Sequence, residues 1–169
     1  MEATSPRWAS SILPALELST SAVVRLAVAR GHDVVNLDAL TYAGTLTTVQ
    51  SVAASERYKF VRADICDGAA VRAAIDEFRP HVITHLAAES HVDRSIDGPG
   101  VFLSSNVAGT FSLLEAVRAH WSTLSQERQR GFRLHHISTY EVFGSLGATG
   151  RFSETTPYDP RSPYSATKA

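Results

Sequence analysis

The most specific chemical signal in the sequence is a Tyr-x-x-x-Lys pair near its carboxyl end, formed by Tyr164 and Lys168. Side chains four residues apart share one face of a helix, so the phenol and the ammonium are expected to lie together. A phenol ordinarily has a pKa of about 10, and a neighbouring positive charge favours its ionised form. Such a pair can accept the proton of an alcohol that is losing a hydride. The same spacing also occurs when an exposed tyrosine and lysine merely share a helix surface.

Two hydroxyl side chains, Ser138 and Thr139, follow a predicted strand upstream of this pair. A hydroxyl at that end of a sheet could hold a substrate alcohol beside the phenol. Their position therefore favours the catalytic interpretation of Tyr164 and Lys168.

The elements that must position these residues alternate along the chain between short β-branched runs and longer segments of helical periodicity. This alternation is typical of βα units that build a parallel sheet, and it predicts one Rossmann-like, doubly wound α/β domain. The predicted strands cover residues 34–38, 58–63, 82–86 and 132–137, and the predicted helices cover residues 21–30, 69–78 and 101–121, with a further helix entering at Tyr164. The segment 144–163 is rich in Gly, Pro, Ser and Thr and is predicted to be a surface loop.

The residues just after each predicted strand matter because open parallel sheets bind ligands beyond the carboxyl ends of their strands. Asp38 can accept hydrogen bonds from both hydroxyls of an adenosine ribose, and Asp64 and Ile65 can meet an adenine ring. The run of Leu86, Ala87 and Ala88 leaves room for the backbone of a cofactor to approach closely. Each site has another interpretation, a turn or helix cap for the acids and tight packing for the alanines. Together they favour a dinucleotide cofactor groove.

Composition excludes several other classes of function. The net charge is −1 and the sequence pI is about 6.6, so we expect neither nucleic acid nor an anionic membrane as a partner. Cys66 is the single cysteine, so no internal disulfide is possible and a reducing, cytoplasmic location fits. No apolar run approaches the roughly 18–20 residues that span a bilayer. The seven histidines form no metal-binding pattern, and adjacent His135 and His136 on a strand must face opposite ways.

Four segments together resemble the dTDP-glucose 4,6-dehydratase family, a branch of the extended short-chain dehydrogenases. They run from Asp38 to Gly44, Leu86 to Ser95, His135 to Thr139 and Ser162 to Lys168, in the family's order and spacing. The resemblance extends from about Ser21 to the end and corresponds to about half of a family member. The C-terminal substrate domain is therefore expected to be missing.

What the resemblance implies is an NAD-dependent conversion of a nucleotide-linked glucose. Tyr164, Lys168 and Thr139 would act in oxidation at C4, with Ser138, Tyr164 and Lys168 also contacting NAD. Glu141 matches the family's base for the C5 proton. Tyr140 stands where the family has an aspartic acid that protonates the departing 6-hydroxyl, so water elimination is expected to be slow. The resemblance further implies a nucleotide-sugar substrate held by Glu89, Ser90 and Arg94, and a homodimer.

The N-terminal residues 1–20 depart from the family because they contain no glycine-rich turn for a pyrophosphate. Pro14 lacks a backbone donor and Glu17 adds negative charge there. One hypothesis is a reading-frame slip, since Gly-Ala-Gly-Val-Ile codons read one base along can give Ala15 to Ser19. We therefore expect a partial NAD-binding domain over residues 21–169 with impaired cofactor affinity. The alternatives are another extended short-chain enzyme, such as a nucleotide-sugar epimerase or decarboxylase, and a non-catalytic module that dimerises.

Overall fold

The structure is a computed structural model that describes residues 7–12, 17–41 and 44–169. Its centre is a five-stranded parallel sheet in the order β3-β2-β1-β4-β5. The strands are β1 (Arg7–Ile12), β2 (Asp33–Asp38), β3 (Tyr58–Arg62), β4 (Val82–His85) and β5 (Arg133–His136). The order reverses at β1, so β2 and β4 flank it, as in doubly wound dinucleotide folds.

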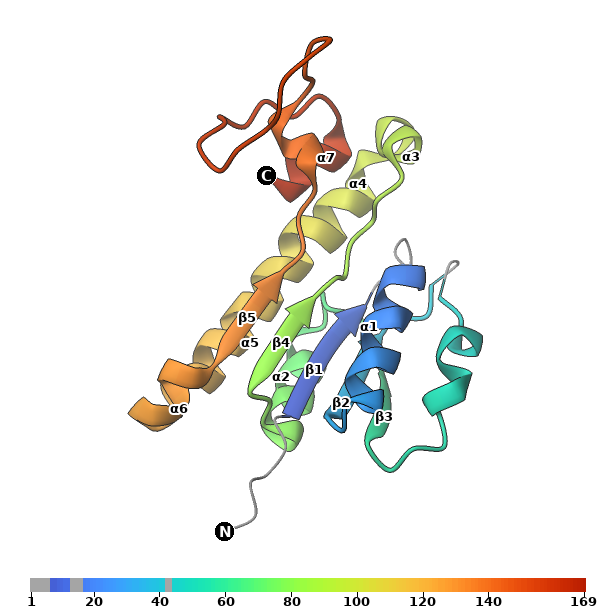
Figure 1. The fold of residues 1–169 in the computed structure, drawn as a ribbon, viewed down its shortest axis with the longest axis vertical. Coiled ribbons are helices and arrows are strands. Elements are labelled where there is room, and N and C mark those ends of the chain that lie inside the picture. Colours follow the sequence, from blue (N-terminus) through green and yellow to red (C-terminus); the bar gives the residue numbers. More distant parts are fainter. Residues whose placement is uncertain (1–6, 13–16, 42–43) are drawn as a thin grey trace.

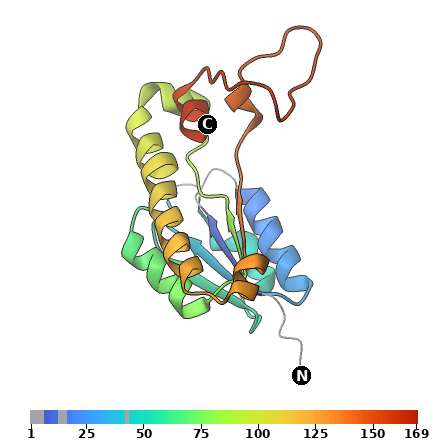
Figure 2. The ribbon, with the colours of Figure 1, turned by 90° about the vertical axis from the view of Figure 1, so that its left-hand side faces the viewer.

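Helices cover both faces of the sheet, which makes three layers (Figures 1 and 2). On one face α1 (Glu17–Ala29) packs with the 3₁₀ helix η2 (Leu46–Val52) against β2, through a core of Val24, Ala27, Val34 and Val49. On the other face α2 (Gly68–Phe78) packs against α5 (Thr110–Ser122), and a second core joins both to β4. That core contains Val71, Ile75, Ile83, Leu113, Ala116, Val117 and Phe132.

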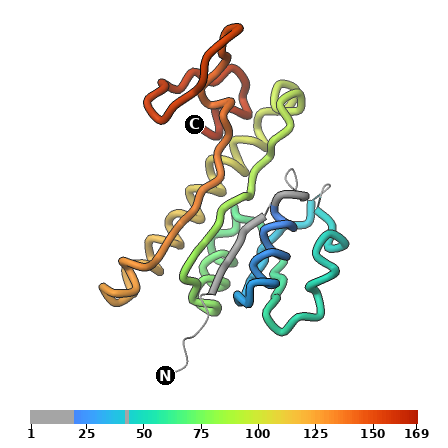
Figure 3. Tube along the Cα trace, in the orientation of Figure 1, coloured from blue at the N-terminus to red at the C-terminus, as the bar shows by residue number. Residues whose placement is uncertain are grey.

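The remaining elements are short and lie mainly at the two ends of the sheet. α3 (Val92–Asp97) follows β4, and α4 (Pro99–Phe102) and the π-helical segment η3 (Leu103–Gly109) lead directly into α5. α6 (Gln126–Gly131) precedes β5, whereas η4 (Tyr140–Phe143) and α7 (Pro163–Lys168) follow it. The tube in Figure 3 shows α7 returning to lie beyond the carboxyl ends of β4 and β5. The chain thus gathers its last helix at the edge where a parallel sheet binds ligands.

The predicted Rossmann-like sheet is confirmed, with one strand that the sequence interpretation missed. Residues 7–12 form β1 and pair with both β2 and β4, although we had treated residues 1–20 as an atypical segment. The first helix begins at Glu17 rather than Ser21. Residues 13–16, including Pro14, lie outside the described part of the chain, so the turn expected to replace the glycine-rich loop stays a prediction.

The helix expected over residues 101–121 is part of a continuous helical stretch from Pro99 to Ser122. By length, and by the mean hydropathy of 1.2 of an 18-residue window, this helix could cross a membrane, contrary to the expectation that no apolar run is long enough. The figures show it lying along the sheet, where its Leu113, Ala116 and Val117 are buried in the core. Only a third of its apolar window is buried in this way, and the helix also carries exposed apolar side chains.

His85 is a buried polar residue at the carboxyl end of β4. Its side chain is 1% exposed, its Nε2 lies 2.9 Å from the Thr110 hydroxyl, and its ring centroid lies 4.8 Å from that of His136. Burial, together with the charges of His136 and Lys168, lowers the pKa of His85 from 6.5 to about 3. The folded protein therefore holds a neutral imidazole here.

We predict that His85 makes stability fall as the pH drops. Its lowered folded-state pKa means that the unfolded chain binds the proton first, so folding stability is lost progressively from pH 6.5 towards pH 3. The loss approaches about 1.4 kcal/mol per pH unit. Urea unfolding of the original chain and of His85→Gln, from about pH 7 to about pH 4, measures this slope, which should be shallower in the variant. The exposed His135→Gln serves as the matched control, and equal slopes in all three proteins would contradict the assignment.

Candidate active site

The helix α7 presents Tyr164 and Lys168 together at the carboxyl end of the sheet. Pro163 occupies its first turn, and Ser162 caps it in a capping box, with its hydroxyl accepting from the Ser165 N–H at 3.0 Å. Both site residues are buried, with Tyr164 8% and Lys168 7% exposed. The alternative in which the pair lies on an exposed helix surface is therefore wrong.

The Tyr164 phenol lies among the residues that follow β5. The Thr139 side chain is close enough to the phenol to lower its pKa as a hydrogen-bonding neighbour, and the Glu141 carboxyl is close enough to act on its charge. Burial and the Glu141 charge raise the pKa of Tyr164, whereas the Thr139 hydrogen bond lowers it. The structure thus brings Thr139, Glu141 and Tyr164 together, as the sequence interpretation required.

A tight turn after η4 helps to hold this group. Gly144 has φ of 80°, and a Cβ there would stand 2.5 Å from the Asp159 carbonyl oxygen. The Asp159 N–H donates in turn to the Val142 carbonyl at 2.9 Å. Gly144 therefore allows the loop that leads to α7 to close directly onto the segment that carries Glu141.

Lys168 is held at its backbone and desolvated at its side chain. The Ser138 hydroxyl donates to the Lys168 carbonyl at 3.0 Å, which ties the end of β5 to α7. Burial lowers the pKa of the Lys168 ammonium from 10.5 to about 8. His85 and His136 are neighbours of the ammonium and have lowered pKa values partly through its charge.

Asn106 is a site residue that the sequence interpretation missed. It is 4% exposed within η3, accepts from the Glu89 N–H at 2.8 Å and donates to the Glu89 carbonyl at 2.9 Å. Its amide also donates to the Thr167 hydroxyl at 2.9 Å. One side chain therefore connects the loop after β4 with α7. The sequence around it offers no signal of this role, because Asn106 shares its segment with two serines and acquires its role from partners at residues 89 and 167.

The predicted adenosine-contacting residues lie at the carboxyl ends of β2 and β3. Asp38 is 5% exposed, and its Oδ1 accepts from the Leu40 N–H at 2.6 Å. Asp64 accepts from the Cys66 N–H at 2.8 Å, so this carboxylate also forms a turn. Ile65 is 1% exposed and packs against Gly109, where a Cβ would stand 2.6 Å from its side chain. These contacts leave both a structural and a ligand-binding role possible for the two acids.

The other predicted residues are distributed around the same edge of the sheet. Leu86, Ala87 and Ala88 are buried where β4 ends. Glu89 is also buried, Ser90 is half-buried, and Arg94 is exposed on α3. Tyr140 is 71% exposed. Among the described residues, no group of three or more His, Cys, Asp or Glu could hold a metal ion.

Comparisons with known proteins place this geometry in a family. Residues 21–169 match the family described as GDP-mannose 4,6 dehydratase. A dTDP-glucose 4,6-dehydratase from Xanthomonas campestris pv. campestris is 57% identical over 143 residues, which cover 85% of this chain and 41% of that protein.

Solved structures of related enzymes resemble this chain in both fold and sequence. The dTDP-glucose 4,6-dehydratase DesIV from Streptomyces venezuelae, with NAD bound, has a TM-score of 0.81 at 35% identity, covering 96% of this chain and 48% of that one. UDP-glucose 4-epimerase from Thermus thermophilus has a TM-score of 0.78 at 30% identity, and the match covers 96% of this chain and 47% of that one. The chain spans less than half the length of these relatives. Because the match extends from residue 21 through the buried Tyr164 and Lys168 to residue 169, the chain belongs to the GDP-mannose 4,6-dehydratase family.

Proposed function

We propose that this chain is the N-terminal, cofactor-binding portion of an NAD-dependent dTDP-glucose 4,6-dehydratase. The observation that carries the proposal is the burial of Tyr164 and Lys168 beside Thr139 and Glu141, at the carboxyl end of the sheet. The identity to named dTDP-glucose 4,6-dehydratases supports the choice of substrate. The relatives are more than twice as long, so we propose that catalysis requires a C-terminal substrate-binding portion.

The described residues fit the two ends of NAD. Asp38, buried at the carboxyl end of β2, suits an adenosine ribose, and Asp64 with Ile65 suits the adenine. The buried run of Leu86, Ala87 and Ala88 allows close approach to the centre of the groove, while Ser138, Tyr164 and Lys168 suit the nicotinamide end. When bound, NAD supplies the hydride acceptor for C4 and the hydride donor for C6.

Tyr164 is proposed to accept the proton of the sugar 4-hydroxyl, with Thr139 hydrogen-bonded to the reacting oxygen atoms. Burial raises the pKa of this phenol, so its ionisation needs nearby positive charge. Lys168 supplies such a charge in its protonated form, and its pKa of about 8 means that it remains mostly charged at neutral pH. The 4-keto group then acidifies the C5 proton, which Glu141 removes.

Tyr140 distinguishes this chain from the pattern implied by its resemblance. It stands where an aspartic acid is expected to protonate the leaving 6-hydroxyl, and its ring is largely exposed. A phenol displaced by a few ångströms is a poor substitute for a carboxylic acid, since misplacement by about 1 Å can cost on the order of a hundredfold. A nucleotide-sugar 4-epimerase is therefore the second candidate, because it needs no acid at this position and is among the structural relatives.

We further propose that Glu89, Ser90 and Arg94 contact the nucleotide sugar. These residues follow β4 and approach α7 through the Asn106 hydrogen bonds and the packing of α3 on α7. We also propose a cytoplasmic location, because a reducing compartment suits a chain whose sole cysteine is Cys66.

Replacing Tyr164 tests the proposed proton acceptor. In a fusion of this chain at Ala169 to the C-terminal portion of the Xanthomonas relative, Tyr164→Phe should lower 4-keto product formation by at least about a hundredfold, because the phenol hydroxyl is lost. Isothermal titration calorimetry should show NAD affinity changed by less than about threefold. Tyr158→Phe, an exposed tyrosine in the same loop region, is the control. Equal activity of the two variants would refute the assigned role.

Replacing Tyr140 separates the two candidate functions. In the same fusion, Tyr140→Asp should increase release of the 4-keto-6-deoxy sugar by roughly tenfold or more, because a short carboxylic acid then reaches the leaving hydroxyl. Mass spectrometry detects the loss of water, and NMR detects inversion at C4. Tyr140→Asn, which has the same shape without the acid, should give no gain. Inversion at C4 without water loss in every variant would favour the epimerase.

A homodimer is proposed from an exposed apolar stripe on the long helix. Its members are spaced three, four or seven residues apart and are each between 43% and 65% exposed: Leu103, Val107, Phe111, Leu114 and Trp121. This stripe points away from the buried face that packs on α2, so it can meet the same stripe of a second copy. Two-fold association is the commonest way to cover such a surface.

A charge within the stripe should dissociate the dimer. Phe111→Glu places an unpaired carboxylate in the centre of the proposed interface and should raise the dimer dissociation constant by about a hundredfold or more. Sedimentation velocity over a concentration series measures the change. Leu26→Glu, at an apolar position of α1 that is 50% exposed against 65% for Phe111, is the matched control and should have no effect. A monomeric original chain, or identical behaviour of both variants, would rule out this interface.

A further inference from the structure

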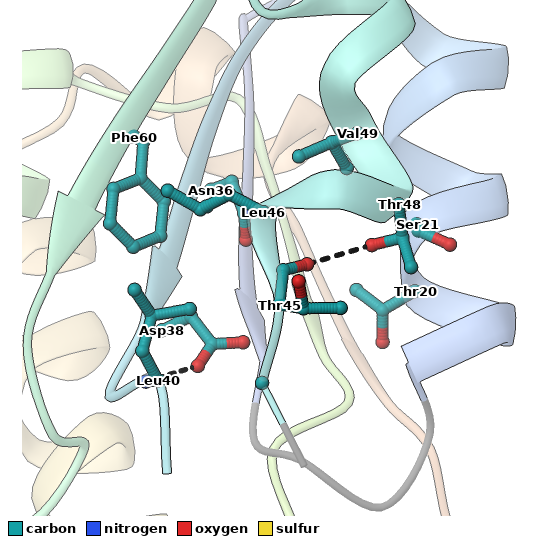
Figure 4. Close-up of a pocket in the computed structure, with 11 residues that line it drawn as sticks. Thr20, Ser21, Asn36, Asp38, Leu40, Thr45, Leu46, Thr48, Val49 and Phe60 are labelled. Atoms are coloured by element: carbon teal, nitrogen blue, oxygen red, sulfur yellow. Dashed lines mark hydrogen bonds between the residues drawn. The ribbon is translucent and has the colours of Figure 1, made fainter. Parts of the chain in front are cut away.

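A small cavity lies between the beginning of α1, the end of β2 and the start of η2. Its volume is about 20 Å³, which corresponds to about one water molecule. Figure 4 shows Thr20 of α1, Asn36 and Asp38 of β2, and Thr45, which caps η2, around this region. Three consecutive elements of the chain therefore surround a single water-sized space.

Two residues that line the cavity each carry a buried side-chain oxygen atom that has no hydrogen-bond partner within the described part of the chain. These atoms are Thr20 Oγ1 and Asn36 Oδ1, and their residues are 0% and 3% exposed. The other end of the Asn36 amide donates to the Tyr58 hydroxyl at 3.1 Å, which orients Oδ1. Buried polar atoms are normally hydrogen-bonded, so this pair indicates a ligand with both donor and acceptor capacity.

The carboxylate of Asp38 lines the same cavity and defines the chemistry of that ligand. Asp38 Oδ1 accepts from the Leu40 N–H, which fixes the carboxylate at the end of β2. A water molecule can donate to Asn36 Oδ1 and to the carboxylate while it accepts from the Thr20 hydroxyl. Three hydrogen bonds are the usual number for a buried water. The volume and the number of available donors and acceptors thus agree with one water.

We propose that Thr20 and Asn36 are positioning residues that hold one ordered water against Asp38. This inference rests on the proposed function, in which Asp38 binds the ribose hydroxyls of the cofactor. The water links the first turns of α1 to the end of β2 and restricts rotation of the carboxylate. Asp38 is thereby kept in the orientation that a ribose diol requires, which lowers the ordering cost of binding.

Near-isosteric substitutions test the water site by crystallography. The unaltered chain should show density for a water within hydrogen-bonding distance of Thr20, Asn36 and Asp38. Thr20→Val and Asn36→Leu should remove it, whereas Thr20→Ser should retain it. A cavity without density in the unaltered chain, or a water that persists in both Thr20→Val and Asn36→Leu, would overturn the proposal.

Calorimetry with ADP and 2′-deoxy-ADP tests the positioning role. Thr20→Val should weaken ADP binding about fivefold to tenfold, in line with the loss of one oriented hydrogen bond. It should leave the affinity for 2′-deoxy-ADP, which lacks the ribose diol, nearly unchanged, and Thr20→Ser should restore ADP affinity. A purely structural defect would weaken both ligands equally and would contradict the positioning role.

The two proposals fail in different ways. If the unaltered chain binds neither nucleotide, the proposed cofactor function of Asp38 fails, and the positioning role fails with it, whereas the crystallographic result still decides the water site. If the unaltered chain binds ADP but Thr20→Val binds it equally well, only the present inference fails. Thermal unfolding verifies that each variant is folded at the temperature used, and Thr20→Val decides alone if Asn36→Leu does not fold.

Discussion

The buried amide of Asn106 is the interaction on which the active-site geometry depends. A parallel sheet delivers its strand ends to one edge, but it does not by itself fix the loop after β4 relative to α7. Asn106 does so by satisfying both backbone groups of Glu89 and the hydroxyl of Thr167. All of these groups are buried or partly buried, so any rearrangement would leave polar atoms unpaired in the interior.

The π-helical geometry of η3 connects this constraint to the packing of the rest of the domain. The same segment ends at Gly109, whose lack of a side chain lets Ile65 approach from the loop after β3. Immediately afterwards Thr110 meets the His85 ring at the end of β4. This short helical stretch therefore contacts the loop after β3, the end of β4 and α7.

Hydrophobic periodicity predicted the four strands and three main helices from residue 21 onward, because their apolar faces are the ones that the sheet buries. β1 was missed because Arg7–Ile12 contains few β-branched residues, and its assignment as a strand depends on pairing with β2 and β4. The grouping of Tyr164 with Thr139 and Glu141 was predicted from the segments that resemble the dehydratase family, which occur in the family's order and spacing. Asn106 and Thr20 could not be found in this way, because their importance arises from hydrogen-bonding partners distant in sequence or from a cavity.

The position of β5 in the sheet has a consequence for association between molecules. Within the described residues β5 pairs with β4 alone, so its other side presents backbone donors and acceptors in the register of a further parallel strand. An unpaired strand at the edge of a sheet can form backbone hydrogen bonds with a strand of another molecule. Arg133 and His135 are exposed along it and oppose such self-association through charge and hydration. This strand therefore combines a backbone edge that is unpaired among the described residues with exposed polar side chains on both sides of Leu134.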